Sequence, residues 1–178
     1  MATGKWKMAK SVTTLLAILL MADVTMAQRE SSSKTASGGA KPVFKAHGAF
    51  VAITVPDIDV AAKWYVEKLG LKIVKNHAMR PDNKAGVTVL QGDGFAVELI
   101  WLDGSAPLSK VAPQVKGPQE IYGILKSGIY VDDLDATLKE LKSRNVTMAF
   151  DTFYDKSMDC RMFAIRDNNG NILQFFGK

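Results

Sequence analysis

Short segments with strand-like apolar patterning occur in two sets of four along the chain. In the first half they lie at residues 49–55, 71–76, 86–91 and 95–101. In the second half they lie at residues 124–131, 146–150, 160–166 and 172–176. Runs of this length, bounded by turn residues, predict eight β-strands.

Two further segments place apolar residues at helical spacing. The predicted helices cover about residues 59–69 and 134–144, and their apolar faces carry Ala61, Trp64, Tyr65 and Leu69, and Leu134, Leu138 and Leu141. Aspartates in the turn before each helix are suited to cap its N-terminus. Each helix is expected to end at Gly70 or Asn145, the residue types that most readily adopt the left-handed conformation.

The two halves are an internal repeat. An offset of 76 residues aligns Val55, Asp57 and Lys63 with Val131, Asp133 and Lys139, and Gly94 with Gly170. The predicted elements of each half follow the order βαβββ. This predicts an α+β protein with two such modules in tandem. A single module leaves one sheet face and one edge open, so the modules must pair with each other or with another copy.

This reading divides the chain into five parts. The first module covers residues 47–102 and the second covers residues 121–178. Residues 103–120 connect them and are rich in helix and strand breakers, among them Pro107, Pro113 and Pro118. Residues 28–46 are polar and Ser-rich, which predicts a flexible linker.

Residues 1–27 resemble a secretory signal peptide. A start with several lysines precedes the apolar stretch of residues 12–22, and Thr25 and Ala27 are small residues before an expected cleavage near Ala27. The apolar stretch is about half of the roughly 20 residues that span a bilayer. We expect a secreted or periplasmic protein without a stable membrane span after processing; retention of the segment as an anchor is the alternative.

Composition and charge narrow the function classes. The 178 residues are 47% hydrophobic and 23% charged, which is typical of a globular protein. The net charge of +5 is spread over interleaved acids and bases, so we expect no nucleic-acid partner. Cys160 is the only cysteine, which excludes an intrachain disulfide, and its apolar strand pattern predicts burial.

Four segments carry a resemblance to a known family. They are residues 50–71 (FVAITVPDIDVAAKWYVEKLGL), 94–100 (GFAVELI), 129–141 (IYVDDLDATLKEL) and 161–176 (RMFAIRDNNGNILQFF). Together they resemble the vicinal oxygen chelate superfamily, which includes glyoxalase I, bleomycin-resistance proteins and extradiol dioxygenases. The resemblance implies that the modules form a curved mixed sheet with a cup. The fold alone does not specify a chemistry, because it serves unrelated ones.

The resemblance also implies four metal-ligand positions, and the residues there depart from the family pattern. In the family's metal enzymes, the first and last strand of each module supply one ligand each. The corresponding residues are Phe50, Glu98, Lys126 and Gln174. Phe50 has no donor atom and a protonated Lys126 repels a cation, so we expect no catalytic metal. If a metal is present, Glu98 and Gln174 with His47 are the remaining candidates.

Strand alternation predicts what fills the cup instead. The expected lining is apolar and aromatic with a few polar groups: Phe50, Thr54, Glu98, Ile100, Lys126, Tyr130, Gln174 and Phe176. Glu98 and Lys126 would both point to the place where the family's enzymes bind their metal. They either form a partly buried ion pair or contact a ligand, and Glu98 is the best candidate for any catalytic role.

Three functions remain open at this stage. The leading hypothesis is a protein that binds a small, partly apolar ligand in the cup without a metal cofactor, in the manner of bleomycin-resistance proteins. The second is a divalent-metal-dependent lyase, isomerase or dioxygenase that uses Glu98 with unusual partners. The third is a structural or interaction module. The resemblance further implies a homodimer whose cups include residues of both chains.

Overall fold

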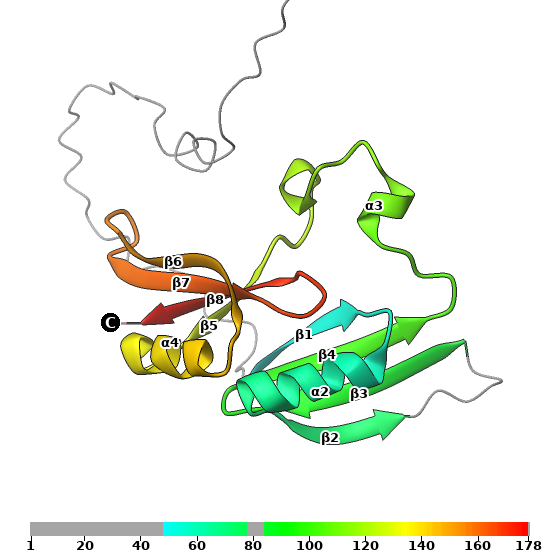
Figure 1. The fold of residues 1–178 in the computed structure, drawn as a ribbon, viewed down its shortest axis with the longest axis horizontal. Helices are drawn as coiled ribbons and strands as arrows, with labels where there is room; N and C mark the ends of the chain where they lie inside the picture. Colours follow the sequence, from blue (N-terminus) through cyan, green and yellow to red (C-terminus); the bar gives the residue numbers. More distant parts are fainter. Residues whose placement is uncertain (1–47, 78–83, 178) are drawn as a thin grey trace, which may run out of the picture. The chain divides into compact units, whose positions relative to one another are not determined.

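The chain folds into two modules with the same order of elements, seen in a computed structural model that describes residues 48–77 and 84–177. The first module contains β1 (Ala49–Thr54), α2 (Ile58–Leu69), β2 (Lys72–His77), β3 (Ala85–Gln91) and β4 (Phe95–Leu102) (Figure 1). The second contains β5 (Ser127–Tyr130), α4 (Leu134–Ser143), β6 (Thr147–Asp155), β7 (Cys160–Arg166) and β8 (Ile172–Gly177). The predicted βαβββ repeat is confirmed.

Each module builds one four-stranded mixed sheet. The strand orders are β1-β4-β3-β2 and β5-β8-β7-β6. The first and last strand of each module pair in parallel, and the other pairs are antiparallel. The tandem α+β architecture predicted from the sequence is therefore correct. β1 and β5 are edge strands in their sheets, so each offers an unpaired backbone edge.

Two strand boundaries differ from the prediction. β5 begins at Ser127, so residues 124–126 lie outside the strand that the apolar pattern had extended to Ile124. β6 continues to Asp155 instead of ending at Phe150, and its pairing with β7 shifts register twice between Met148 and Phe153. Such irregularities bend a strand and interrupt the alternation of apolar and polar residues, so the sequence pattern did not predict the second half of β6.

The ends of both long helices follow the predicted caps. Asp57 accepts a hydrogen bond from the Val60 amide at 3.0 Å, and Asp133 accepts one from the Ala136 amide at 2.8 Å. Gly70 and Asn145 both adopt the left-handed conformation, with φ of 72° and 55°. Each half thus contains its own signals for starting and stopping its helix.

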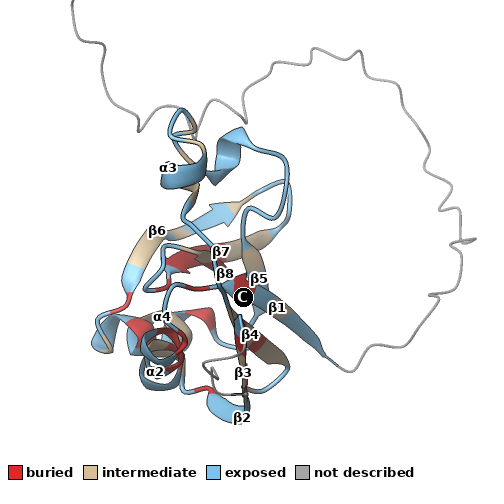
Figure 2. Ribbon diagram, turned by 90° about the vertical axis from the view of Figure 1, so that its right-hand side faces the viewer, coloured by how far each residue is buried: buried red, intermediate tan, exposed pale blue. Residues whose placement is uncertain are grey.

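The hydrophobic core lies between the helices and one face of each sheet (Figure 2). Its fully buried members come from both modules: Ala61, Tyr65, Leu90, Val97, Leu99, Leu134, Phe163 and Ile165. The stacked rings of Phe163 and Phe175, with centroids 5.0 Å apart, belong to the same cluster. One continuous core therefore joins the two modules.

Hydrogen bonds connect the described parts of the two modules at two places. The Tyr65 hydroxyl on α2 donates to Asp167 at 2.8 Å, in the turn between β7 and β8. At the helix C-termini, Lys68 donates to the Arg144 carbonyl at 2.5 Å, and Arg144 donates to the Lys68 carbonyl at 3.3 Å. Lys68 and Arg144 occupy equivalent positions of the repeat, so their contact is reciprocal, as at an interface between identical subunits.

The connection between the modules, residues 103–126, contains α3 (Leu108–Val111) and the 3₁₀ turn η2 (Pro118–Glu120). Neither buries a residue. Figures 1 and 2 show this connecting arm standing away from both sheets.

The remaining expectations concern Cys160, membrane spans and the N-terminal segment. Cys160 is half-buried rather than buried, because it opens β7 directly after an exposed turn. Across residues 48–77 and 84–177, no helix has the length and apolar character needed to cross a membrane. The signal peptide, the linker and His47 lie outside the described residues.

Candidate functional site

Each sheet has one face that packs on a helix, and we call the opposite face the open face because it is exposed along β1 or β5. On the second sheet this face is exposed only near β5, since Met162, Ala164 and Gln174 of β7 and β8 are buried. On β1 and β4, Ile53, Val97 and Leu99 point to the core. The alternate residues, Phe50, Ala52, Thr54, Ala96, Glu98 and Ile100, form the first open face. On β5 and β8, Leu173 and Phe175 point to the core, and Gly128, Tyr130, Ile172, Gln174 and Phe176 form the second open face. The predicted cup residues on these strands therefore share the expected sides.

The first open face combines an exposed aromatic ring with a half-buried carboxylate. Phe50 is 67% exposed although it is a large apolar residue. Ala52 of β1 pairs with Glu98 of β4, and Thr54 pairs with Ile100, so the four residues lie side by side. Glu98 and Ile100 are half-buried, whereas Thr54 is exposed. This face can bind an apolar surface next to a single negative charge.

The second open face carries a pair of aromatic rings. Tyr130 and Phe176 stack with ring centroids 5.1 Å apart, and Tyr130 is 82% exposed. Gly128 makes room for the pair, since a Cβ at that position would lie 3.0 Å from the Phe176 ring. A flat aromatic platform therefore stands open on β5 and β8.

Gln174 is the buried polar group of the second open face. It is only 1% exposed, and its Nε2 contacts the Met162 sulfur at 2.8 Å. Its Oε1 has no hydrogen-bond partner among the described residues. An unpaired buried amide oxygen lowers the free energy of unfolding by about 1–3 kcal/mol. The presence of glutamine at this buried position therefore needs an explanation.

Lys126 lies at the end of the connecting arm, one residue before β5, and is exposed. With Thr54 and Ile124 it lines a pocket of about 260 Å³ between β1 and the start of β5. Both Glu98 and Lys126 are described, and they form no ion pair with each other within this chain. The internal ion pair considered from the sequence is therefore absent from this part of the chain.

The four positions implied for a metal do not present a metal-binding set. Phe50 offers no donor, Lys126 offers a cation, Glu98 offers one carboxylate and Gln174 offers one amide oxygen. A tight divalent site needs more anionic or imidazole ligands than this. No group of three or more His, Cys, Asp or Glu side chains gathers within residues 48–77 and 84–177. The residues described at these positions do not fit the metal that the superfamily often binds.

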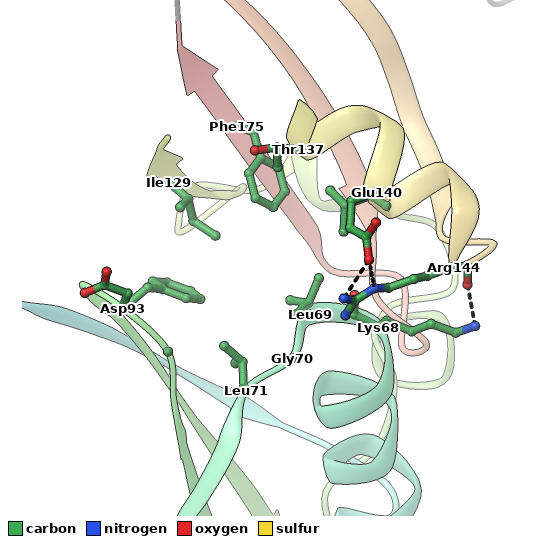
Figure 3. Close-up of a pocket in the computed structure, with 13 residues that line it drawn as sticks. Lys68, Leu69, Gly70, Leu71, Asp93, Ile129, Thr137, Glu140, Arg144 and Phe175 are labelled. Carbon is green, nitrogen blue, oxygen red and sulfur yellow. Dashed lines mark hydrogen bonds and ion pairs between the residues drawn. The ribbon is translucent and has the colours of Figure 1, made fainter. Parts of the chain in front are cut away.

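A second pocket, which the sequence did not predict, lies at the junction of the modules on the helix side. Its volume is about 450 Å³. Leu69, Leu71, Ile129 and Phe175 point into it, and the Arg144–Glu140 ion pair lies at its edge (Figure 3). Lys68 and Arg144, which the repeat offset makes equivalent, both line this pocket.

Tyr65 and Asp167 form a buried hydrogen-bonded pair that joins the two modules. Burial, together with the negative charge and the hydrogen bond of Asp167, raises the pKa of Tyr65 far above its ordinary value. Asp167 also accepts from the backbone amides of Asn169 and Asn171 and from the Asn171 side chain. All these donors hold the carboxylate inside the core between the modules, so the pair is part of the packing.

Comparison with known proteins identifies the fold. The family model described as Glyoxalase/Bleomycin resistance protein/Dioxygenase superfamily matches residues 49–175. A glyoxalase family protein from Enterococcus faecalis is 17% identical with a TM-score of 0.57, covering 74% of this chain and 96% of that chain. A glyoxalase/bleomycin resistance protein/dioxygenase domain from Frankia sp. EAN1pec is 19% identical with a TM-score of 0.56, covering 75% and 98%. No curated protein matches the chain in sequence.

Proposed function

The chain belongs to the glyoxalase/bleomycin resistance protein/dioxygenase superfamily, and we propose that it binds a small, partly apolar molecule on its open faces without a catalytic metal. The observation that carries this proposal is Gln174. Its amide oxygen is buried and unpaired among the described residues, and the register of β5 and β8 places it two residues before Phe176 on the same face as the Tyr130–Phe176 stack. An apolar or aromatic surface with one or two polar anchors is the usual composition of a small-molecule site.

The chemistry of the open faces indicates the kind of ligand. The exposed rings of Phe50 and Tyr130 favour a planar, apolar body. The Gln174 oxygen is an acceptor, so the ligand should bring an N–H or O–H donor to it. Glu98 and Lys126 supply one charge of each sign at the border, which favours a neutral or zwitterionic ligand over a strongly charged one.

A substitution at Gln174 tests this role through opposite effects on stability and binding. Gln174→Leu replaces a buried amide with an apolar side chain of similar size. We expect the free energy of unfolding to stay equal or rise by about 1 kcal/mol, because an unpaired polar atom is removed. Ligand binding should fall at least tenfold, because the anchor is lost.

The measurement uses protein expressed from the full sequence and a panel of planar heteroaromatic compounds, first by thermal shift and then by calorimetry. Ile165→Val, on the core face of the neighbouring strand β7, is the control and should retain binding. If no compound binds the parent protein, or if Gln174→Leu binds as well as the parent, the proposal is wrong.

Metal analysis separates this function from the enzymatic alternative. We expect plasma mass spectrometry to find no stoichiometric Zn, Ni, Mn or Fe on protein purified without chelator. A bound metal that Glu98→Ala removes would instead support a metal-dependent lyase, isomerase or dioxygenase. Glu98 would then act with Gln174 and with His47.

We also propose that the protein is exported. The support is the sequence of residues 1–27, in which a lysine-bearing start, an apolar stretch and small residues near Ala27 follow one another. Intact-mass measurement on protein recovered from the periplasm or the medium should find Gln28 at the N-terminus. Recovery only in the cytoplasm with residues 1–27 present would contradict export.

A further inference from the structure

The helix-side pocket where the two modules meet has no role in the proposed function, which concerns the opposite faces of the sheets. We call it the junction pocket. Its volume of about 450 Å³ lies within the range of pockets that hold a small molecule. Both modules contribute to its apolar lining, which consists of Leu69, Leu71, Phe95, Ile129, Leu141 and Phe175. Figure 3 shows several of these side chains pointing into the pocket.

The internal repeat identifies the side chains that fill the equivalent place in the other half of the molecule. The offset of 76 residues relates Glu140 and Leu141 on α4 to Trp64 and Tyr65 on α2. The rings of Trp64 and Tyr65 pack edge to face with their centroids 5.0 Å apart, and Tyr65 is fully buried. Helix α4 therefore carries a carboxylate and a leucine where α2 carries two aromatic rings.

The turn that faces each helix differs in a corresponding way. Tyr65 on α2 donates to Asp167 in the turn between β7 and β8, and the offset relates Asp167 to Gln91 at the end of β3. Asp167 is 5% exposed, whereas Gln91 is exposed. Leu141 has no hydroxyl that could make the same hydrogen bond. The junction pocket lies on this side, between α4 and the turn that joins β3 to β4.

The wall that the first module contributes to the junction pocket is more apolar than the equivalent surface of the second module. Three leucine or phenylalanine residues line the pocket where the offset places asparagine or threonine: Leu69, Leu71 and Phe95 against Asn145, Thr147 and Asn171. The half that lacks the aromatic pair thus has the more apolar wall. Such a wall favours an apolar ligand, because binding removes apolar surface from water.

The charged lining residues favour a neutral ligand that carries a hydrogen-bond donor. Lys68 and Arg144 balance Glu140 and Asp93, so the formal charges cancel. Arg144 is paired with Glu140 at 2.7 Å, and Lys68 donates to the Arg144 carbonyl. Asp93 forms no ion pair with the described residues, so its carboxylate is available as an acceptor.

We propose that the junction pocket is a second small-molecule site, which binds a neutral aromatic compound with a hydroxyl or N–H group, such as a naphthol or an indole. The aromatic ring takes the place equivalent to that of Trp64 and Tyr65 in the other half. The hydroxyl or N–H group donates to Asp93, as Tyr65 donates to Asp167. This site is separate from the open faces, and the inference does not rest on the proposed function.

Calorimetry with 2-naphthol and protein expressed from the full sequence tests the site. We expect a dissociation constant below about 1 mM. Glu140→Trp restores one of the rings that α2 carries and should raise this constant at least tenfold, because it fills the pocket. Glu140→Gln, which removes only the charge, and Lys139→Trp, which adds the same ring at the next and exposed position of α4, should leave it within twofold. Binding that Glu140→Trp leaves unchanged would overturn the proposal.

The role of Asp93 is tested by removing the donor from the ligand. 2-Naphthol should bind about fivefold more tightly than 2-methylnaphthalene, and Asp93→Ala should abolish this difference. Equal affinities of the parent protein for the two compounds would overturn the role of Asp93.

Methyl NMR locates the bound compound without relying on a variant that fills the pocket. Nuclear Overhauser contacts from 2-naphthol to the methyl groups of Leu71 and Ile129 are expected. Contacts to Ile100 or Ile172 instead would place the compound on the open faces and overturn the junction site.

The junction site and the proposed function can fail separately. 2-Naphthol binding that is lost in Glu140→Trp and kept in Gln174→Leu supports the junction site. The reverse result assigns the compound to the open face, which supports the proposed function and overturns this inference. The Gln174→Leu comparison is therefore repeated in the Glu140→Trp background, where binding reports on the open face alone. Absence of 2-naphthol binding to the parent protein overturns the junction site, whatever other compounds bind to the open face.

Discussion

Tyr65 and Asp167 show how one buried pair joins the two modules at the scale of single residues. Tyr65 is fully buried and Asp167 is 5% exposed, and they are 102 residues apart in sequence. The tyrosine hydroxyl is one of four donors that compensate the carboxylate for its lost hydration. The sequence placed Tyr65 on the apolar face of a predicted helix, and Asp167 between two predicted strands. It gave no indication of their contact, because nothing local relates positions so far apart.

Tyr65→Phe should lower the free energy of unfolding by about 1.5–3 kcal/mol near neutral pH, because a hydrogen bond to a buried carboxylate is lost. Equilibrium urea unfolding measures the loss. Tyr154→Phe is the matched control, since Tyr154 is half exposed and bonds only to Asp159 in the turn before β7. A Tyr65 variant that is as stable as the parent would show that the contact contributes nothing.

The same pair predicts a pH dependence. Burial and Asp167 raise the pKa of Tyr65 above its ordinary value of 10.0, so the folded state keeps the hydroxyl proton where the unfolded state loses it. The stabilisation is therefore complete below pH 10 and falls above it, by about 1.4 kcal/mol per pH unit for one tyrosine. Urea titrations at pH 8, 10 and 11 should show the advantage of the parent over Tyr65→Phe shrinking as pH rises. A constant difference would contradict the raised pKa.

At the scale of elements, the helix ends were the most predictable feature of the chain. Asp57, Gly70, Asp133 and Asn145 all cap as their residue types indicate, because capping depends on a few neighbouring backbone groups. The start of β5 was predicted wrongly for a related reason. Ile124 and Leu125 continue the apolar pattern of the strand, yet both are exposed and precede the first residue of β5, and residue type alone does not distinguish an exposed apolar residue from one in a strand.

Gly70→Ala tests the left-handed cap of α2. The Cβ has room, since its nearest contact is the Arg144 guanidinium at 3.6 Å, so only the positive φ opposes the substitution. We expect a loss of about 1–2 kcal/mol in the free energy of unfolding. Asn145→Gly at the equivalent cap of α4 should change stability by less than about 0.5 kcal/mol, because Asn already tolerates this conformation. Thermal unfolding of both variants measures the difference.

The reciprocal contact between α2 and α4 yields a separate prediction. Lys68→Met and Arg144→Met each remove side-chain donors from the last carbonyls of the other helix, at a cost of about 1 kcal/mol each. Because the two residues contact each other, each donating to the other's carbonyl, the double variant should depart from additivity by about 0.5 kcal/mol or more. Lys63→Met, which breaks only the exposed 3.7 Å ion pair with Glu67, should have almost no effect. Losses no larger than that of Lys63→Met would exclude a role in joining the modules.

At the scale of the whole molecule, the repeat and the resemblance predicted the family and the architecture. The candidate site was less predictable, because it depends on side-chain packing that neither the repeat nor the resemblance specifies. Gln174 and Lys126 were assigned to the two implied ligand positions of the second module, yet Gln174 is buried against Met162 and Lys126 is exposed just before β5. The unpaired state of the Gln174 oxygen could not be predicted, because it depends on which side chains reach it across β7 and β8. The pocket lined by Leu69, Ile129 and Phe175 at the module junction was also not predicted, because it depends on how the two modules pack.

Rebuilding the implied metal ligands tests the arrangement of the whole molecule. Phe50→His/Lys126→His/Gln174→Glu supplies, with the retained Glu98, two imidazoles and two carboxylates, a set that suits Zn or Ni. We expect plasma mass spectrometry to find about one metal per chain on this variant and less than about one tenth on the parent. Phe50→His alone, with too few ligands, should remain metal-free.

The oligomeric state of the rebuilt protein then locates the cup. If the four positions converge within one chain, sedimentation velocity should find the metal on monomeric protein, because a monomer holds the complete set. If the positions instead meet across two copies, the metal should be found only in the oligomeric fraction, and added metal should increase that fraction. Absence of metal from the rebuilt protein in both states would mean that the four positions do not converge, and that the resemblance to the metal enzymes stops at the fold.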